Sequence, residues 1–236
     1  MLFKKPLKRI LNNLGFARHA PTVGNVNFGD LNRTSPFSTE FGYDRGGPVD
    51  RYYIENFLEK NNADVHGDVL EIGDNEYTLR FGGSKIVKSH ILHVDDKNPA
   101  ATYVGDLSNA PQIPDNKFDC IVLTQTLHLI YDFKGAIATC YRILKPGGVL
   151  LMTVPGISNI DFTDWKHLWL WAFTDSAIQK ILSESFPEKN IETDVFGNVM
   201  VATAFLYGMG LPEIGKDKLD SCDPHYQVII TARAVK

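Results

Sequence analysis

The chain has little of three features that would narrow its function at once, namely cysteine, excess positive charge and long apolar runs. Its 236 residues include three cysteines and carry a formal net charge of -4. The cysteines, Cys120, Cys140 and Cys222, are odd in number and widely spaced, which indicates reduced thiols and not a disulfide scaffold. The negative balance gives no general electrostatic reason to bind nucleic acid. No stretch approaches the roughly 20 apolar residues of a membrane span, so we expect a cytoplasmic protein without stable membrane insertion and without a nucleic-acid partner.

The N-terminal part of the sequence differs from the rest. Residues 1–18 mix basic with apolar side chains, which predicts a short amphipathic helix. This helix either packs on its own domain or contacts an anionic membrane surface. Residues 20–50 are rich in glycine and proline and predict a long loop of the kind that is often functional. We therefore divide the chain into an N-terminal arm or lid, 1–45, and a single domain, 46–236.

Short apolar runs alternate with longer helical segments from residue 68 onward, which is typical of βαβ units. The predicted strands lie at 68–72, 89–94, 102–104, 118–124, 148–154, 191–196 and 226–235. The first five are almost continuously apolar, as expected for strands that are covered on both faces and run parallel. The sequence therefore predicts an α/β fold with a mostly parallel, seven-stranded sheet and helices on both faces.

Four segments predict helices, at 54–60, 133–144, 174–186 and 199–207. The clearest is 133–144, because its apolar residues recur at intervals of three and four. Lys145 followed by Pro146 and two glycines is a suitable end for such a helix. This segment is the expected crossover between the fourth and fifth strands.

Polar side chains gather at the predicted carboxyl ends of the strands, where an open parallel sheet binds its ligand. The residues concerned are Glu71, Gly73, Asp74, Asp95, Asp96, Asp106, Thr124 and Gln125. Asp95 stands about 20 residues beyond Gly73, where a carboxylate accepts two hydrogen bonds from a ribose. The alternative is that Asp95 only stabilises a turn.

Four motifs in this order resemble those of class I S-adenosylmethionine-dependent methyltransferases. They read Val69-Leu-Glu-Ile-Gly73, Gly105-Asp-Leu107, Phe118-Asp-Cys-Ile-Val-Leu-Thr124 and Arg142-Ile-Leu-Lys-Pro-Gly-Gly148, within residues 65–156. The resemblance implies a Rossmann-like fold and S-adenosylmethionine as cofactor. It also implies that Gly73 lies beside the methionine end, that Asp95 holds the ribose, and that Asp106 and Leu107 border the adenine. Glu71, Asp74, Thr124 and Gln125 are the further cofactor-binding candidates.

The first motif departs from that family, because Asp74, Asn75 and Tyr77 stand where further glycines are usual. A dinucleotide needs the backbone of this loop close to its pyrophosphate, and side chains here would obstruct it. S-adenosylmethionine has no phosphates. The departure therefore disfavours one alternative function, that of a nucleotide-binding Rossmann-like enzyme. A second alternative stays open, that of a non-catalytic binding or scaffold protein with the methyltransferase fold.

A dense segment of glycine, charged and aromatic residues, 41–53, precedes the first predicted helix. Two interpretations stay open for it. Asp50 caps the helix, or the segment contacts the ligand, with Arg51 and Tyr52 donating hydrogen bonds to the methionine carboxylate.

His128 and His167 are the candidate catalytic bases. His128 follows the fourth strand by four residues, and the ordinary pKa of histidine suits proton transfer from a hydroxyl group. The alternative for His128 is a structural role. Trp165 and Trp169, on either side of His167, either line an acceptor pocket or form the buried face of one helix. We predict no metal, because no set of His, Asp and Glu has metal-ligand spacing.

The resulting prediction is an enzyme that transfers a methyl group from S-adenosylmethionine to a hydroxyl, less probably an amine, of a small molecule or a sugar or glycan. The sugar acceptor rests on a resemblance to methyltransferases associated with glycosyltransferases. Its motifs are Asp44-Arg-Gly46, Asp50-Arg-Tyr-Tyr53 and Trp171-Ala-Phe-Thr174. A homodimer is included among the expected assemblies.

Overall fold

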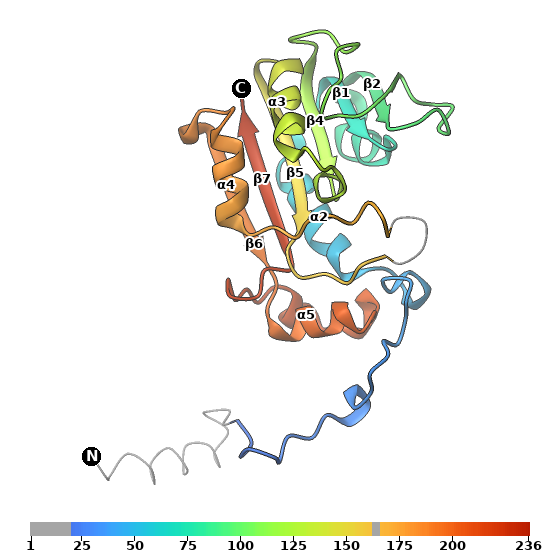
Figure 1. Ribbon diagram of the computed structural model, residues 1–236, viewed down its shortest axis with the longest axis vertical. Helices are drawn as coiled ribbons and strands as arrows, with labels where there is room; N and C mark the ends of the chain where they lie inside the picture. The colour runs from blue at the N-terminus through green and yellow to red at the C-terminus, as the bar shows by residue number, and fades with distance from the viewer. Residues whose placement is uncertain (1–19, 162–165) are drawn as a thin grey trace, which may run out of the picture. The chain divides into compact units, whose positions relative to one another are not determined.

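The computed structural model describes residues 20–161 and 166–236 (Figure 1). By the contacts among its residues, the chain divides into two units, Met1–Ser35 and Pro36–Lys236. The described part of the first unit is irregular apart from one 3-10 turn, Gly29–Leu31. The helix predicted at 1–18 lies outside the described residues, and the predicted boundary after residue 45 stays a prediction.

The second unit contains a seven-stranded sheet of order β3-β2-β1-β4-β5-β7-β6. The strands are β1 Gly67–Ile72, β2 Ile86–His93, β3 Tyr103–Val104, β4 Phe118–Thr124, β5 Leu144–Pro155, β6 Ile191–Phe196 and β7 Ile229–Val235. The pairs among β1 to β5 are parallel, and β7 runs antiparallel between β5 and β6. This confirms the predicted mostly parallel sheet. The last strand begins three residues later than predicted, because a turn closed by the Tyr226 N–H bonded to the Asp223 carbonyl precedes it.

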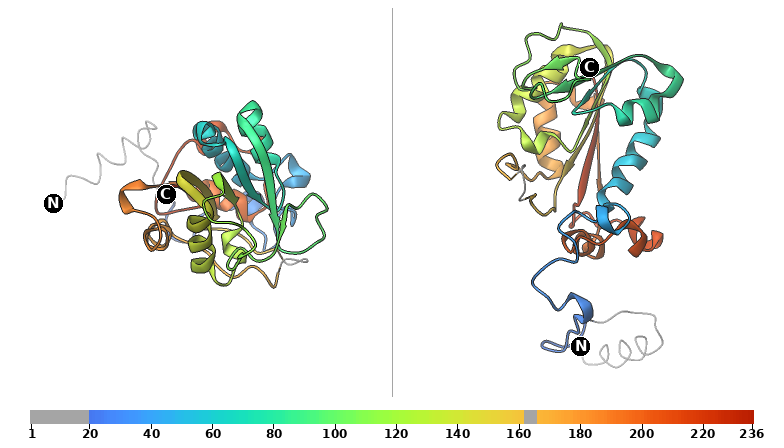
Figure 2. Two further views of the ribbon diagram at one scale, coloured as in Figure 1. Left: turned by 90° about the horizontal axis from the view of Figure 1, so that it is seen from above. Right: turned by 90° about the vertical axis from the view of Figure 1, so that its right-hand side faces the viewer.

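Helices cover both faces of this sheet, as the right-hand view of Figure 2 shows for α3 and α4 on one side and α2 on the other. Their bounds are α2 Val49–Lys60, α3 Phe133–Ile143, α4 Asp175–Ser183, α5 Val199–Leu206 and α6 Lys216–Leu219. Helix α2 starts five residues before the predicted position. Pro48 provides its N-cap with φ of −69°, a value that proline adopts without strain.

Alternation along the strands explains why both faces are covered. Leu70 and Ile121 pack in the cluster that includes residues of α3 and α4. Their neighbours Val69 and Val122 pack instead in the cluster that includes Ile54, Phe57 and Leu58 of α2. Because successive side chains of a strand point to opposite faces, a strand that is apolar at every position needs a helical layer on each side. The continuous apolar runs in the sequence are therefore the direct cause of the three-layer arrangement.

The order of the strands reverses between β1 and β4. The chain moves outward from β1 through β2 to β3 and then returns to pair β4 with the other edge of β1. In an open sheet of this kind the ligand binds in the crevice beyond the carboxyl ends of the strands at the reversal. The ends of β1, β2 and β4 are therefore the place to look for a functional site.

Candidate active site

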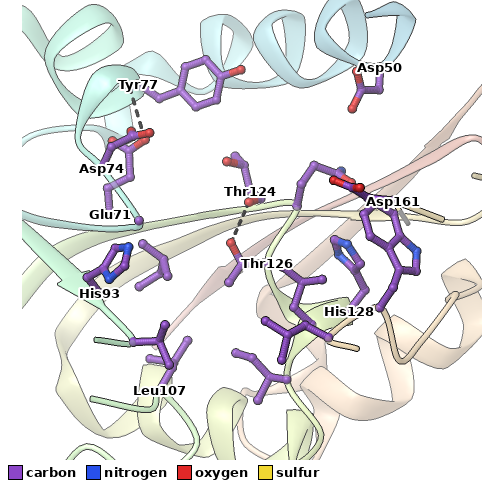
Figure 3. Close-up of a pocket in the computed structure, with 18 of the residues that line it drawn as sticks. Asp50, Glu71, Asp74, Tyr77, His93, Leu107, Thr124, Thr126, His128 and Asp161 are labelled. Atoms are coloured by element: carbon purple, nitrogen blue, oxygen red, sulfur yellow. Dashed lines mark hydrogen bonds between the residues drawn. The ribbon is translucent and has the colours of Figure 1, made fainter. Parts of the chain in front are cut away.

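A cavity of about 1050 Å³ lies at the carboxyl ends of these strands (Figure 3). Ligand cavities in proteins span roughly 300 to 1,000 Å³, so this one is large enough for a cofactor and an acceptor together. Nine residues that the sequence predicted as functional line it, namely Arg51, Glu71, Gly73, Asp74, Asp106, Leu107, Thr124, Gln125 and His128. Tyr52, Asp95 and His167 are not among its lining residues.

Gly73, which directly follows β1, leaves open space for a ligand at the cavity wall. Its φ is +93°, a conformation that side chains with a Cβ rarely adopt, and a Cβ built there would meet no atom within 4 Å. The loop is held in place, because the Gly73 N–H donates to the Leu92 carbonyl and the Asn98 amide donates to the Gly73 carbonyl at 2.8 Å. This single glycine therefore supplies the close backbone approach that the rest of the motif lacks.

The side chain of Glu71, a residue of β1, lies at the start of the helical turn that follows this loop. Its side chain is 3% exposed, and it accepts hydrogen bonds from the backbone N–H groups of Tyr77 (3.3 Å) and Thr78 (2.7 Å). Burial raises the pKa of Glu71 to about 7, although these hydrogen bonds oppose the shift. The N–H groups that would hold a pyrophosphate at a helix N-terminus are thus already bonded to a carboxylate of the protein itself.

Arg51, on α2, reaches the cavity from the opposite layer. Its guanidinium donates to the hydroxyl groups of Tyr77 at 2.9 Å and Tyr43 at 3.0 Å, and all three side chains line the cavity. The adjacent Tyr52 points elsewhere, because its hydroxyl donates to the Asp220 carboxylate. Of the two residues predicted to bind the methionine carboxylate of the cofactor, Arg51 therefore lines the cavity and Tyr52 does not.

The end of β2 presents His93 and Val94 to the cavity in place of Asp95. The Asp95 carboxylate lies 3.0 Å from His93 Nδ1 and 2.9 Å from Lys97 Nζ, and its side chain is 36% exposed. His93 is not among the residues that the sequence singled out. The strand ends at His93, which pairs with Val104, and this pairing is what brings its side chain to the cavity. That Asp95 binds the ribose stays a prediction.

His128 lies at the other end of the cavity, in the 3-10 turn Leu127–Leu129 after β4. It is 2% exposed, and neither ring nitrogen has a hydrogen-bond partner among the described residues. Burial lowers its pKa to about 4, so the imidazole is neutral at physiological pH. Between β4 and this turn, Gln125 has a φ of +45°, an uncommon value for a residue with a Cβ, and such strain concentrates at functional sites.

A row of ring side chains extends from His128 along the cavity. We call it the aromatic wall, and it consists of His128, Trp169, Phe41 and Phe205. The ring of Trp169 lies 4.5 Å from that of His128 and stacks on Phe41 at 5.9 Å, while Phe41 lies 6.3 Å from Phe205. All four line the cavity. The sequence did not single out Phe41 or Phe205, because they are distant in the chain and Phe41 reaches the wall through a backbone with φ of +54°.

Trp169 follows a turn and lies in no helix, so the interpretation that it forms the buried face of one is wrong. Trp165 lies outside the described residues. Backbone hydrogen bonds from Leu170 and Trp171 to the His128 carbonyl hold this segment against the turn that carries His128. His167, in the same segment, is exposed.

Asp50 also lines the cavity, and its capping interpretation is wrong. Pro48 is the N-cap of α2, no side chain caps the helix, and Asp50 is its second residue. The Asp50 Oδ1 atom is buried without a hydrogen-bond partner, and this burial raises the pKa of the carboxyl group. Figure 3 shows Asp50 above and His128 below at one end of the cavity, with Asp74, His93 and Leu107 at the other.

Among residues 20–161 and 166–236, no three His, Cys, Asp or Glu side chains are grouped so that they could hold a metal ion. No helix in the same residues is long and apolar enough to cross a bilayer.

A family model described as a methyltransferase domain matches residues 68–152. The segment that runs from β1 into β5 is therefore similar to a methyltransferase domain. Over 86 residues, the chain is 34% identical to the ubiquinone/menaquinone biosynthesis C-methyltransferase UbiE of Yersinia pestis, strain Pestoides F. The aligned part is 36% of this chain and 32% of that relative, so the match spans about a third of the relative's length.

Solved structures resemble this chain over a larger part of its length. A methyltransferase dependent on S-adenosylmethionine from Archaeoglobus fulgidus has a TM-score of 0.53 at 11% identity, covering 79% of this chain and 94% of that one. Its counterpart from Mesorhizobium loti has a TM-score of 0.52 at 15% identity, covering 80% and 99%. The [4+2]-cyclase SpnF has a TM-score of 0.52 at 16% identity, covering 78% and 80%. At these identities, the likeness shows the fold alone.

The matched segment, 68–152, contains most of one end of the cavity and only part of the other. Glu71, Gly73, Asp74 and Asp106 fall inside residues 68–152, as does His128. Outside it are Phe41, Asp50, Arg51, Trp169 and Phe205. Apart from Arg51, the lining residues that the sequence predicted for the cofactor therefore lie in the matched segment, while most of the other end lies outside it.

Proposed function

We propose that this protein transfers a methyl group from S-adenosylmethionine to a hydroxyl group of a small molecule or a sugar. The observation that carries the proposal is His128, whose two unpartnered ring nitrogens are buried at the end of the cavity opposite to Asp74. A buried polar group without a partner is costly, about 1 to 3 kcal/mol. Such a group beside a cavity is best explained by a ligand that completes its hydrogen bonds.

The residues at the first end of the cavity fit the cofactor. Gly73 leaves room for a close approach, and Asp74 and Asp106 supply negative charge beside a ligand whose sulfonium and ammonium groups are positive. Arg51 keeps guanidinium hydrogens beyond the two that it donates to Tyr43 and Tyr77, and these would bind the methionine carboxylate. Leu107 provides an apolar surface for the adenine ring.

The cofactor supplies an electrophilic methyl group. At the other end of the cavity, His128 would accept the proton that the acceptor hydroxyl loses when the methyl group is transferred to its oxygen. A neutral imidazole has a free lone pair for that proton, although the burial that lowers the pKa of His128 to about 4 makes it a weaker base than an ordinary histidine. The apolar rings of the aromatic wall exclude water, which would otherwise compete for the hydrogen bonds of the reacting groups.

Two alternatives are weaker. A dinucleotide enzyme conflicts with Glu71 on the helix N-terminus and with Asp74 beside it, since both repel a pyrophosphate. A protein of this fold that does not transfer methyl groups keeps support from the cyclase among the similar structures. Because the relatives are C-methyltransferases, methylation of carbon is the variant of our proposal that an acceptor screen has to test beside oxygen and nitrogen.

Calorimetric titration with S-adenosylmethionine and with NAD tests the cofactor first. We expect heat with S-adenosylmethionine and none with NAD, and the reverse result would overturn the proposal. Release of S-adenosylhomocysteine with a panel of sugars, phenols and amines then tests the reaction. Binding of the cofactor with no release on any acceptor favours a binding protein. The cytoplasmic location and the homodimer remain predictions from sequence.

A further inference from the structure

The electrostatics of the cavity limit what acceptor it takes. Seven carboxyl side chains line it, those of Asp50, Glu55, Glu71, Asp74, Glu76, Asp106 and Asp161. Arg51 is the one lysine or arginine among the described lining residues. Glu55 is paired with Arg80 outside the cavity, and burial raises the pKa of both Glu71 and Asp50, but Asp74, Glu76 and Asp106 still outnumber Arg51 and leave an excess of negative charge. A cavity with this balance attracts a cation and repels a phosphate or carboxylate.

The cofactor already accounts for the positive charge that this cavity favours. S-adenosylmethionine has one net positive charge, and the product that remains after methyl transfer has none. A cationic acceptor would face the sulfonium at close range, and an anionic one would face the carboxyl groups. The acceptor that fits beside the bound cofactor is therefore uncharged.

The far end of the cavity combines flat apolar surfaces with two hydrogen-bonding groups. The aromatic wall presents the rings of Phe41, Trp169 and Phe205, which favour a flat or ring-shaped ligand. His128 has two unpartnered nitrogens and Asp50 has an unpartnered Oδ1. These groups come from α2 and from the turn after β4, on opposite sides of the same end of the cavity (Figure 3). A ligand with one polar group would leave either His128 or Asp50 without a hydrogen-bond partner.

We propose that the acceptor is an uncharged ring with at least two hydroxyl groups, which lies against the aromatic wall and donates one hydroxyl to Asp50 while the other faces His128. This inference rests on the proposed function and assigns Asp50 to acceptor binding. Sugars and dihydroxybenzenes share this chemistry. A phosphorylated or nucleotide-linked sugar does not, because its phosphates would meet the excess of carboxyl groups.

The test uses paired acceptors with the full-length protein. Each pair compares a ring with its charged or less hydroxylated counterpart: methyl hexosides with hexose 6-phosphates, and catechol with phenol. Release of S-adenosylhomocysteine gives KM and kcat for each. We expect turnover on members of the uncharged, multiply hydroxylated group and at least 10-fold lower kcat/KM on their counterparts. Whether the hexosides or catechol react distinguishes the two sources of the ring.

The variant Asp50→Asn tests the role of Asp50, with the exposed Asp217→Asn as a matched control outside the cavity. Loss of a hydrogen bond to a charged group corresponds to roughly 10-fold or more. We expect Asp50→Asn to raise KM for the best acceptor by that factor and to change the Kd for S-adenosylmethionine less than 2-fold. Asp217→Asn should change neither.

The outcomes separate this inference from the proposed function. No binding of S-adenosylmethionine by the unaltered protein defeats both. Turnover that is equally fast on phosphorylated or singly hydroxylated rings defeats the inference and leaves methyl transfer standing. A Kd for S-adenosylmethionine that rises in Asp50→Asn as much as KM for the acceptor assigns Asp50 to the cofactor and also overturns it. Binding of the cofactor without turnover on any pair counts against the acceptor class.

Discussion

The two ends of the cavity are built differently. The end predicted for the cofactor comes from residues that directly follow consecutive strands, such as Gly73 after β1 and His93 at the end of β2. The acceptor end collects Phe41, Trp169 and Phe205 from separate parts of the chain. The first end follows from the topology of the sheet, whereas the second depends on the packing of segments that the sheet does not position.

This difference indicates how specificity can change without loss of the fold. Parallel strands place their carboxyl ends at one edge of a sheet whatever the surrounding loops contain. Loops at that edge vary more freely because few core contacts depend on them. The matched segment, 68–152, contains most of the first end and leaves most of the aromatic wall outside. Substitutions at the two ends should therefore affect different measurements.

The largest effect should come from His128→Ala at the acceptor end. Removing the group that accepts the proton is expected to lower kcat by roughly 100-fold or more, while the Kd for S-adenosylmethionine changes less than 2-fold. Steady-state rates with the best acceptor and calorimetry on the same preparation check both numbers. A normal rate would refute the role of His128, and an equal loss of cofactor affinity would refute the separation of the two ends.

At the cofactor end, Glu71→Gln should change the pH dependence of stability. The pKa of Glu71 is raised from 4.5 to about 7 by burial. A carboxyl group with a raised folded-state pKa contributes stability that is complete below its unfolded pKa and is lost as pH rises through the folded one. The free energy of unfolding should therefore fall between pH 4.5 and 7 by on the order of 2–3 kcal/mol from this group.

Denaturant unfolding of both proteins across that range isolates the contribution. Other groups, including His128 with its lowered pKa, titrate in the same window but are common to both proteins. The difference between the two curves should therefore decline with rising pH. A difference that does not depend on pH would show that Glu71 is ionised throughout and that its helix-terminal hydrogen bonds determine its charge.

The sequence located most of the residues that line the end predicted for the cofactor, and the reason is physical. Apolar runs locate the strands, and the residue after each run is carried to the ligand edge by the sheet itself, as Glu71, Gly73 and Thr124 illustrate. At β2 the strand ends at His93, one residue earlier than predicted, and the cavity is lined there by His93, which the sequence did not single out. Periodicity does not determine a strand end to one residue, and one residue changes the face on which a side chain lies.

The acceptor end could be predicted only in part. His128 was found because it closely follows β4, whereas Arg51, found because charged residues are dense in its segment, is proposed for the cofactor end. Nothing in the sequence marked the rings of Phe41 and Phe205 as cavity residues, because phenylalanine is equally suited to the core. Only tertiary packing brings these two rings to 6.3 Å from each other. Tyr52 shares the segment of Arg51 but lies on a different side of α2, where it bonds to Asp220.

A pair of variants at the end of β2 decides between the sequence prediction and the geometry. If Asp95 binds the ribose, Asp95→Ala weakens the binding of S-adenosylmethionine by about 1 to 3 kcal/mol through lost hydrogen bonds. If His93 is the residue in contact, His93→Ala produces the loss and Asp95→Ala does not. The position of His93 in the cavity wall favours the second result. Calorimetric Kd values for both variants, measured side by side, discriminate between them.

The smallest effect is expected for Tyr52→Phe, which also tests the predicted cofactor contact of Tyr52. The hydroxyl of Tyr52 bonds to the Asp220 carboxylate in an exposed position and does not line the cavity. Its loss should cost less than about 1 kcal/mol of stability, as is typical of solvent-exposed polar pairs, and should leave the Kd for S-adenosylmethionine unchanged. If affinity falls instead by 10-fold or more, α2 rearranges when the cofactor binds, and the cofactor end depends on packing as strongly as the acceptor end does.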